Sequence, residues 1–152
     1  MQKITTFLWF DNRAEEAANL YVSIFKNSRI VGVHRVDGKV LTVTFELEGQ
    51  QFIGLNGGPL YKFTEAISLF VDCEGQQEVD ELWAKLSTGG EPGRCGWLKD
   101  KFGVSWQIIP KTLMKLMGDP DPAKSQAVMQ AMLKMNKIVV EDLQKAYEGK
   151  AA

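Results

Sequence analysis

The alternation of apolar and polar positions in the first third of the chain predicts a strand, a helix and three more strands. Residues 3–10 are rich in β-forming side chains, and Asp11 and Asn12 then break the strand and can cap a helix. Residues 14–25 carry alanine and aromatic side chains at helical spacing. The extended segments that follow, separated by the turn sequences DGK and EGQ, are 30–36, 40–47 and 51–56. The first half therefore reads as a β-α-β-β-β unit.

The same order begins again after the turn sequence NGGP. AISLFVDC predicts a strand, QQEVDELWAKLS a helix with one apolar face, and CGWLK and VSWQII two strands, with a poorly marked strand around residues 90–93. Aligning FLWFD with SLFVD gives a weak internal repeat with an offset of 61 residues, from Phe7 to Ser68. Because three strands follow one another without helices, we expect an α+β fold.

We expect the 152 residues to form a single domain. It contains two paired βαβββ modules, residues 3–57 and 65–110, whose sheets form a curved, half-open barrel with the helices outside, and a helical tail over residues 111–148. In that tail Asp121 and Pro122 favour a helix start, with Asp as N-cap, and residues 123–137 and 141–147 are expected to be helical. The methionine-rich apolar stripe formed by Val128, Met129, Met132 and Met135 is too large to stay in water. We therefore expect the tail to pack on the barrel or on a second subunit.

The charge balance gives no electrostatic case for nucleic acid or for an anionic membrane, since 18 Lys and Arg face 19 Asp and Glu, a net charge of −1. No apolar run is long enough to cross a bilayer, and the first residues are strand-like rather than a signal peptide, so the sequence predicts a cytoplasmic protein. Cys73 and Cys95 form no C-x-x-C pair, and we expect free thiols that pack as small hydrophobes.

Several linked motifs carry a family resemblance: FLWFDNRAEEAANLY at the start, LNGGP closing the first half, CGWLKDKFGVSWQIIP closing the second, and DPDP before the methionine-rich helix. Over residues 3–148 the chain resembles the PhnB-like branch of the vicinal oxygen chelate superfamily, which includes glyoxalase I, extradiol dioxygenases and bleomycin-resistance proteins. The resemblance implies the glyoxalase/bleomycin resistance/dioxygenase fold and a homodimer. Relatives in this branch often carry the label 3-demethylubiquinone 3-methyltransferase.

The resemblance also locates the positions where the metal enzymes of the superfamily carry ligands, on the first and last strand of each module. Matching the motifs gives Thr5 (or Thr6 after a slip of one residue), Gly54, Ala66 and Gln107. Divalent metals need carboxylate oxygens or imidazole nitrogens, which this set does not supply, and His34 lies outside it. We therefore predict no metal and no other cofactor.

Strand alternation from these positions assigns a concave face. It places Phe52 and Asn56 beside Gly54 on that face, and it places Ile53 and Leu55 on the opposite face under a helix. The third strand contributes Thr42, Thr44 and Glu46, and Trp97 is a further wall. The candidate ligand-binding residues are Thr5, Phe7, Trp9, Thr44, Glu46, Asn56, Ser68, Phe70, Trp97 and Gln107.

Aromatic side chains mixed with small polar groups favour a metal-independent protein that binds a small, planar or partly apolar molecule. Three alternatives stay open at this stage. The chain is an enzyme, with non-standard metal ligands or with Glu46 as a general base; it is a methyltransferase, although the NGGP turn is not followed by a cofactor-binding helix; or the aromatics fill the barrel and the protein serves as a structural homodimer.

Overall fold

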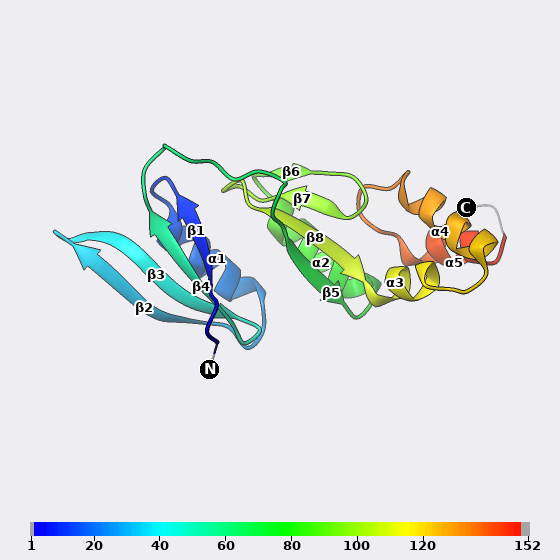
Figure 1. Cartoon of the computed structure of the whole chain (residues 1–152), viewed down its shortest axis with the longest axis horizontal. Helices are drawn as coiled ribbons and strands as arrows, with labels where there is room; N and C mark the ends of the chain where they lie inside the picture. Colours follow the sequence, from blue (N-terminus) through cyan, green and yellow to red (C-terminus); the bar gives the residue numbers. More distant parts are fainter. Residues whose placement is uncertain (1, 150–152) are drawn as a thin grey trace. The chain divides into compact units, whose positions relative to one another are not determined.

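A four-stranded sheet with one helix forms the first part of the chain in the computed structural model, which describes residues 2–149. In chain order its elements are β1 (Thr6–Phe10), α1 (Ala14–Ile24), β2 (Arg29–Val36), β3 (Lys39–Leu47) and β4 (Gln50–Asn56) (Figure 1). The strand order is β1-β4-β3-β2, with β1 parallel to β4 and the other neighbours antiparallel. This unit ends at Phe63, and a second compact unit begins at Thr64.

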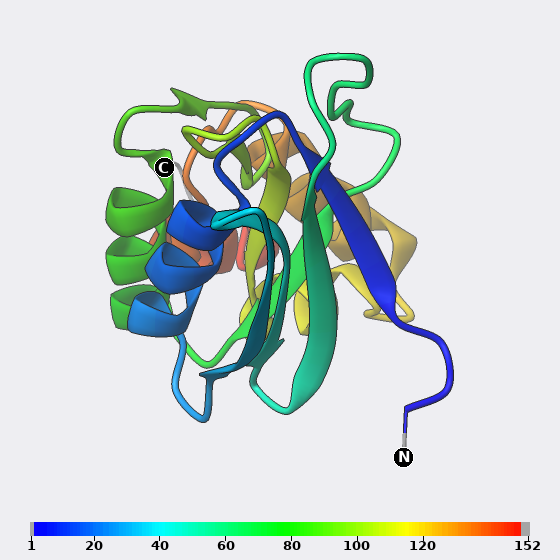
Figure 2. The ribbon, with the colours of Figure 1, turned by 90° about the vertical axis from the view of Figure 1, so that its left-hand side faces the viewer.

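Helix α1 covers one face of this sheet, as Figure 2 shows. Its alanines and Tyr21 are fully buried, and the Tyr21 ring lies 6.2 Å from the ring of Phe45 on β3. Small side chains let the helix approach the sheet closely, and the apolar area removed from water there stabilises the unit. The helix therefore faces Leu8, Phe10, Val43, Phe45 and Phe52.

The second unit repeats the plan with β5 (Leu69–Cys73), α2 (Gln76–Ser87), β6 (Glu91–Pro92), β7 (Trp97–Lys99) and β8 (Ser105–Pro110). The strand order is β5-β8-β7-β6, and β5 runs parallel to β8 as β1 does to β4. The α2 side chains Val79, Leu82 and Leu86 are buried on this unit's sheet. The predicted α+β class and the double βαβββ order are confirmed.

The tail forms the helices α3 (Lys111–Met117), α4 (Pro122–Met132) and α5 (Val140–Tyr147). It packs on its own unit, since Ile109 of β8 shares a buried cluster with Leu113, Val128, Ile138 and Leu143. The Asp121 cap is confirmed, because its Oδ1 accepts a hydrogen bond from the Ala123 amide at 3.0 Å.

The expectation that the helix after Asp121 reaches residue 137 is wrong, since α4 ends at Met132. The carbonyls of Met135 and Asn136 instead accept hydrogen bonds from the amides of Cys95 and Gly96, at 2.9 and 2.8 Å. These hydrogen bonds attach the tail to the loop before β7, and this tertiary contact overrides the local helical pattern.

A single glutamine makes a second attachment of the tail. Gln76, at the start of α2, donates through Nε2 to the Ile138 carbonyl at 2.9 Å and accepts through Oε1 from the Val140 amide at 2.7 Å. Its amide thereby satisfies one acceptor and one donor of the segment between α4 and α5.

Both cysteines are free thiols, as expected, Cys73 buried and Cys95 half-buried. Burial, together with the neighbouring Glu78, raises the pKa of the Cys73 thiol to about 12. No helix within residues 2–149 has the length and apolar character needed to span a bilayer.

Candidate functional site

The sheet of the first unit turns its open face away from α1, and strand pairing defines the rows on that face. Phe7 of β1 lies beside Ile53 of β4, which lies beside Thr44 of β3. The next row joins Trp9, Leu55 and Thr42 in the same way. Phe7 is 55% exposed. The strand register therefore puts Phe7, Trp9 and Thr44 on one face of the sheet, as the sequence predicted.

The sequence-based assignment of Phe52, Gly54 and Asn56 to this open face is wrong. The parallel register pairs Leu8 with Gly54, and a Cβ added at Gly54 would lie 3.3 Å from the Cβ of Ala14 in α1. Gly54 therefore lies under the helix, where an added methyl group would require Ala14 or Phe10 to shift by a few tenths of an ångström. The motif match was one residue too far along β4. Because side chains alternate with a period of two, this error assigned every side chain of β4 to the wrong face of the sheet.

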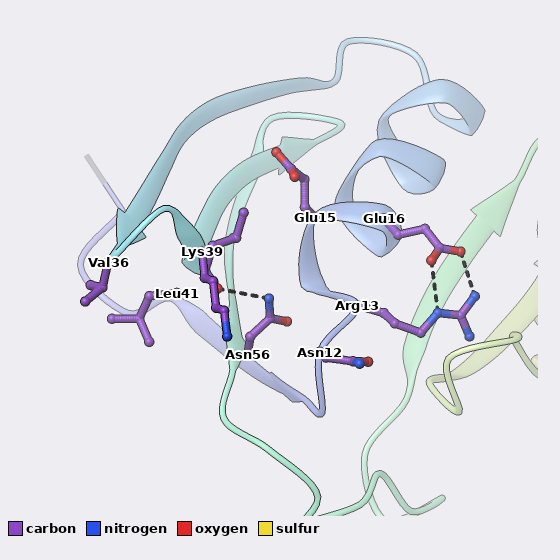
Figure 3. A pocket seen from close by; sticks show the side chains of 9 residues that line it. Asn12, Arg13, Glu15, Glu16, Val36, Lys39, Leu41 and Asn56 are labelled. Atoms are coloured by element: carbon purple, nitrogen blue, oxygen red, sulfur yellow. Dashed lines mark hydrogen bonds and ion pairs between the residues drawn. The ribbon is translucent and has the colours of Figure 1, made fainter.

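Asn56 holds the helix start rather than the open face. Its Oδ1 accepts from the Ala14 amide at 2.8 Å, and its Nδ2 donates to the Val40 carbonyl at 3.1 Å. A hollow of about 620 Å³ lies beside it, and Figure 3 shows Arg13 at the border held by Glu16. The Asn56 amide is thus occupied on both its donor and acceptor sides by the fold.

Three other predicted residues of the first unit have structural partners or lie at its margin. The Glu46 carboxylate is paired with Arg29 on the neighbouring strand, Nε–Oε2 3.1 Å, which neutralises its charge. The Trp9 indole donates to the Gly58 carbonyl at 2.9 Å and meets the Tyr61 ring edge-on at 4.9 Å between ring centres. Thr5 is half-buried and directly precedes β1.

The open face of the second unit gathers four of the predicted residues. Trp97 of β7 pairs with Gln107 of β8, which pairs with Phe70 of β5. Gln107 is also within hydrogen-bonding distance of Ser68, its Nε2 donating to Ser68 Oγ at 3.0 Å. The opposite face, with Leu98, Trp106 and Ile108, is buried.

The assignment of Ala66 to a ligand position on this strand is wrong, because Ala66 lies in a turn ahead of β5. The two units repeat with an offset of 63 residues, seen in the starts of β1 at Thr6 and β5 at Leu69. With this offset Thr5 corresponds to Ser68. The alignment by hydrophobic pattern, with its offset of 61 residues, was therefore two residues short.

Asp100 fixes the turn that leads into β8. This buried carboxylate accepts from the amides of Phe102 and Val104 through Oδ1, at 2.9 and 3.0 Å, and from the Trp106 indole through Oδ2 at 2.9 Å. Charge-assisted hydrogen bonds of this kind hold a turn firmly. The KDKFGVSW sequence therefore presents Ser105 in a fixed position opposite Lys99.

Next to this row the second unit has a hollow of about 410 Å³. Strand pairing aligns Glu91, Lys99 and Ser105 across it, and Trp97 forms a wall. The Lys99 ammonium binds Glu65, Nζ–Oε1 2.5 Å, and this contact raises the pKa of Lys99. Of the predicted site residues Trp97 borders the hollow, whereas Ser105 and Lys99 were not among them. Alternation from Gln107 and Trp97 was the signal that could have found both.

The side chains at these positions do not fit a divalent metal ion. In the second unit, Ser68 and Gln107 offer only neutral oxygens as ligand atoms. In the first unit, Ile53 takes the position on the open face that the sequence had assigned to Gly54, and its side chain offers no ligand atom. Within residues 2–149 there is also no group of three or more His, Cys, Asp or Glu side chains arranged to hold a metal.

Comparison with known families now places the chain. The family model described as 3-demethylubiquinone-9 3-methyltransferase matches residues 2–109. The chain belongs to this family. The match covers both βαβββ units and stops before the tail helices α3 to α5.

Solved structures agree with this membership. The PhnB protein from Bacillus cereus is 41% identical over 72% of this chain and 99% of its own, with a TM-score of 0.66. The resemblance to PhnB-like proteins is therefore confirmed. A Pseudomonas aeruginosa protein (16% identity, 72% of this chain and 98% of its own, TM-score 0.59) and an Arabidopsis thaliana gene product (18%, 70% and 96%, 0.50) share the fold. No curated protein matches the chain.

Proposed function

We propose that this chain binds a small, planar or partly apolar molecule on the open face of its second unit, without a metal ion. The observation that carries the proposal is the hollow of about 410 Å³ beside Trp97, because small-molecule sites typically measure about 300–1,000 Å³ and combine apolar walls with a few polar groups. Trp97 and Pro92 provide apolar surface, and Ser105 and Lys99 provide the polar groups.

The neighbouring residues on the same face extend this site. Phe70 is half exposed and stands in one row with Gln107 and Trp97. The Gln107 and Ser68 side chains bind one another, so each is already oriented. On the first unit, Phe7, Trp9, Thr44 and Thr5 are proposed as a second ligand-facing set, whereas Glu46 is engaged with Arg29.

Titration of the full chain with a library of planar metabolites tests the proposal. We expect saturable changes in tryptophan fluorescence, which Trp97→Phe removes and Trp83→Phe on α2 leaves in place. Failure of every compound to give a saturable change would reject binding at this hollow. A dialysis step against a chelator before the titration is expected to leave the response unchanged.

The family description favours methyl transfer as a second candidate. The glycine turn after β4 argues against methyl transfer, because the amides of Gly57 and Gly58 already donate to the carbonyls of Phe10 and Asp11, at 2.8 and 3.0 Å. These amides have no free N–H to offer a cofactor. Isothermal titration with S-adenosylmethionine decides: saturable binding favours the methyltransferase, and its absence at millimolar cofactor excludes it.

We also propose that the chain forms a homodimer, as its family resemblance implies. Light scattering on the full chain measures this, and a monomer mass at micromolar concentration would contradict it.

A further inference from the structure

Ser105 is a buried hydroxyl that the protein does not satisfy. Its side chain is 1% exposed, and its Oγ has no hydrogen-bond partner among residues 2–149. It also lines the hollow beside Trp97. A buried polar group without a partner costs free energy, and such groups are rare in native structures. The hollow therefore contains a polar group prepared for a partner from outside the chain.

The Trp97 indole, on a half-buried side chain, adds a hydrogen-bond donor at the same hollow. Trp9 and Trp106 donate their indole N–H to Gly58 and Asp100, whereas in the described part of the chain the Trp97 N–H has no acceptor. An indole can only donate, and a serine hydroxyl can donate. The complementary group on a ligand is an acceptor oxygen.

The charges around the hollow cancel. Lys99 is bound by Glu65, and the other charged lining residues, Glu91 and Arg94, have opposite signs. An anion entering beside Ser105 would meet an ammonium that already has a carboxylate partner. Burying a charge without a partner is costly, so this lining favours a neutral molecule.

We propose that the molecule bound in this hollow is neutral and flat, with a carbonyl oxygen that accepts from Ser105 Oγ and a ring that lies against Trp97. This inference rests on the proposed function and adds the chemical class of the ligand. Ser105 and Trp97 are then the residues that select a carbonyl compound.

Three probes of similar shape test the class: acetophenone, benzoate and isopropylbenzene. They keep one ring and change the substituent from a neutral carbonyl to a carboxylate to a group without oxygen. Binding to the full-length chain is followed by the indole ¹H–¹⁵N NMR signal of Trp97, assigned with Trp97→Phe. We expect acetophenone to bind most tightly. Tighter or equal binding of benzoate would overturn the neutral class, and equal binding of isopropylbenzene would overturn the carbonyl while leaving the proposed function intact.

Ser105→Ala separates a ligand contact from a structural role. We expect this variant to lose about tenfold in acetophenone affinity, with isopropylbenzene unaffected and the thermal midpoint unchanged or higher, because an unsatisfied hydroxyl is removed. Ser125→Ala in α4, whose hydroxyl binds the Pro122 carbonyl, is the matched control and is expected to bind like the parent chain. Unchanged acetophenone affinity in Ser105→Ala overturns the assignment. If no probe shifts the Trp97 signal while a compound of the metabolite library still gives a Trp97-dependent fluorescence change, this inference fails and the proposed function stands.

Discussion

The side-chain amide of Gln107 on β8 donates a hydrogen bond to the hydroxyl of Ser68, the residue just before β5, at 3.0 Å. In the second unit these two side chains bind each other. A neutral amide paired with a hydroxyl keeps a fixed orientation without any ion. This contact gives the second unit a pre-oriented polar group on its open face.

Removing this contact is expected to cost stability as one ordinary hydrogen bond. Gln107→Ala and Ser68→Ala are each expected to lower the free energy of unfolding by about 0.5–1.5 kcal/mol in urea denaturation. The double variant is expected to lose less than the sum of the two, since both single changes remove the same bond. Strict additivity of the two losses would show that the contact contributes nothing.

The donor chemistry of the open faces also predicts the response to metals. Incubation with Mn²⁺, Ni²⁺ or Zn²⁺ followed by desalting is expected to leave less than stoichiometric metal by elemental analysis, and chelation is expected to leave the thermal midpoint unchanged. Gln107→Glu adds a carboxylate without completing a ligand set, so it is expected to behave like the parent chain. One tightly held ion per chain in the parent protein would contradict the metal-independent function.

Three glycines predict a graded series of alanine variants. A Cβ at Gly57 would lie 2.4 Å from Cε2 of Trp9, whose ring is held by Gly58 and Tyr61, a Cβ at Gly54 would lie 3.3 Å from that of Ala14, and Gly32 has open space. Gly57→Ala is expected to destabilise most, by about 1–3 kcal/mol, Gly54→Ala less, and Gly32→Ala by about 0.5 kcal/mol at most. Denaturant unfolding measures the order, and a large loss for Gly32→Ala would refute it.

The contact between Tyr147 and Asp119 predicts a pH dependence of stability. The Tyr147 hydroxyl donates to Asp119 Oδ2 at 2.6 Å, which lowers the pKa of Asp119, and the same contact raises the pKa of Tyr147. The Asp119 contribution is present above the ordinary carboxyl pKa and is lost as pH falls through the lowered value. The Tyr147 contribution is present below the ordinary tyrosine pKa and is lost as pH rises through the raised value.

Tyr147→Phe is therefore expected to reduce the thermal midpoint most between about pH 5 and pH 9 and to converge with the parent chain toward both extremes. Tyr61→Phe in the first unit is the control, with an expected pH-independent effect. A deficit of Tyr147→Phe that stays constant from acid to alkaline pH would contradict the ionic character of the contact.

The buried cluster under the tail predicts a large loss for one isoleucine. Ile138 is fully buried, and Ile138→Ala is expected to cost about 2–5 kcal/mol through lost transfer energy and the cavity left behind. Leu133, which is 44% exposed at the end of α4, is the control, with an expected change within about 0.5 kcal/mol on substitution by Ala. Equal losses would show that the tail is not anchored through Ile138.

The sequence predicted the elements well where local signals are strong. The bounds of α2 follow the helical pattern, and the Asp121 and Pro122 pair marks the start of α4. Boundaries failed where a tertiary contact decides. Ile4 reads as strand but is 87% exposed before β1, because the β1–β4 ladder begins at Thr6.

The open-face residues were harder to predict because register is a relation between distant strands. The local sequence of residues 53–55 does not determine that Ile53, rather than Gly54, lies beside Phe7. The interpretation of Asn56 failed for a similar reason, since its partners at Ala14 and Val40 come from other elements. Strand alternation from Gln107 places Ser105 on the open face, but its missing hydrogen-bond partner becomes visible only when all surrounding atoms are placed.

The Gln76 side chain binds two backbone groups, at Ile138 and Val140, that belong to a segment beyond the reach of the family model. Relatives as short as the Bacillus cereus protein, matched over 99% of its length by 72% of this chain, leave over a quarter of this chain unmatched. An amide at the Gln76 position is thus expected to be inherited together with the C-terminal extension. That covariation can be read directly from the genes of longer and shorter homologues.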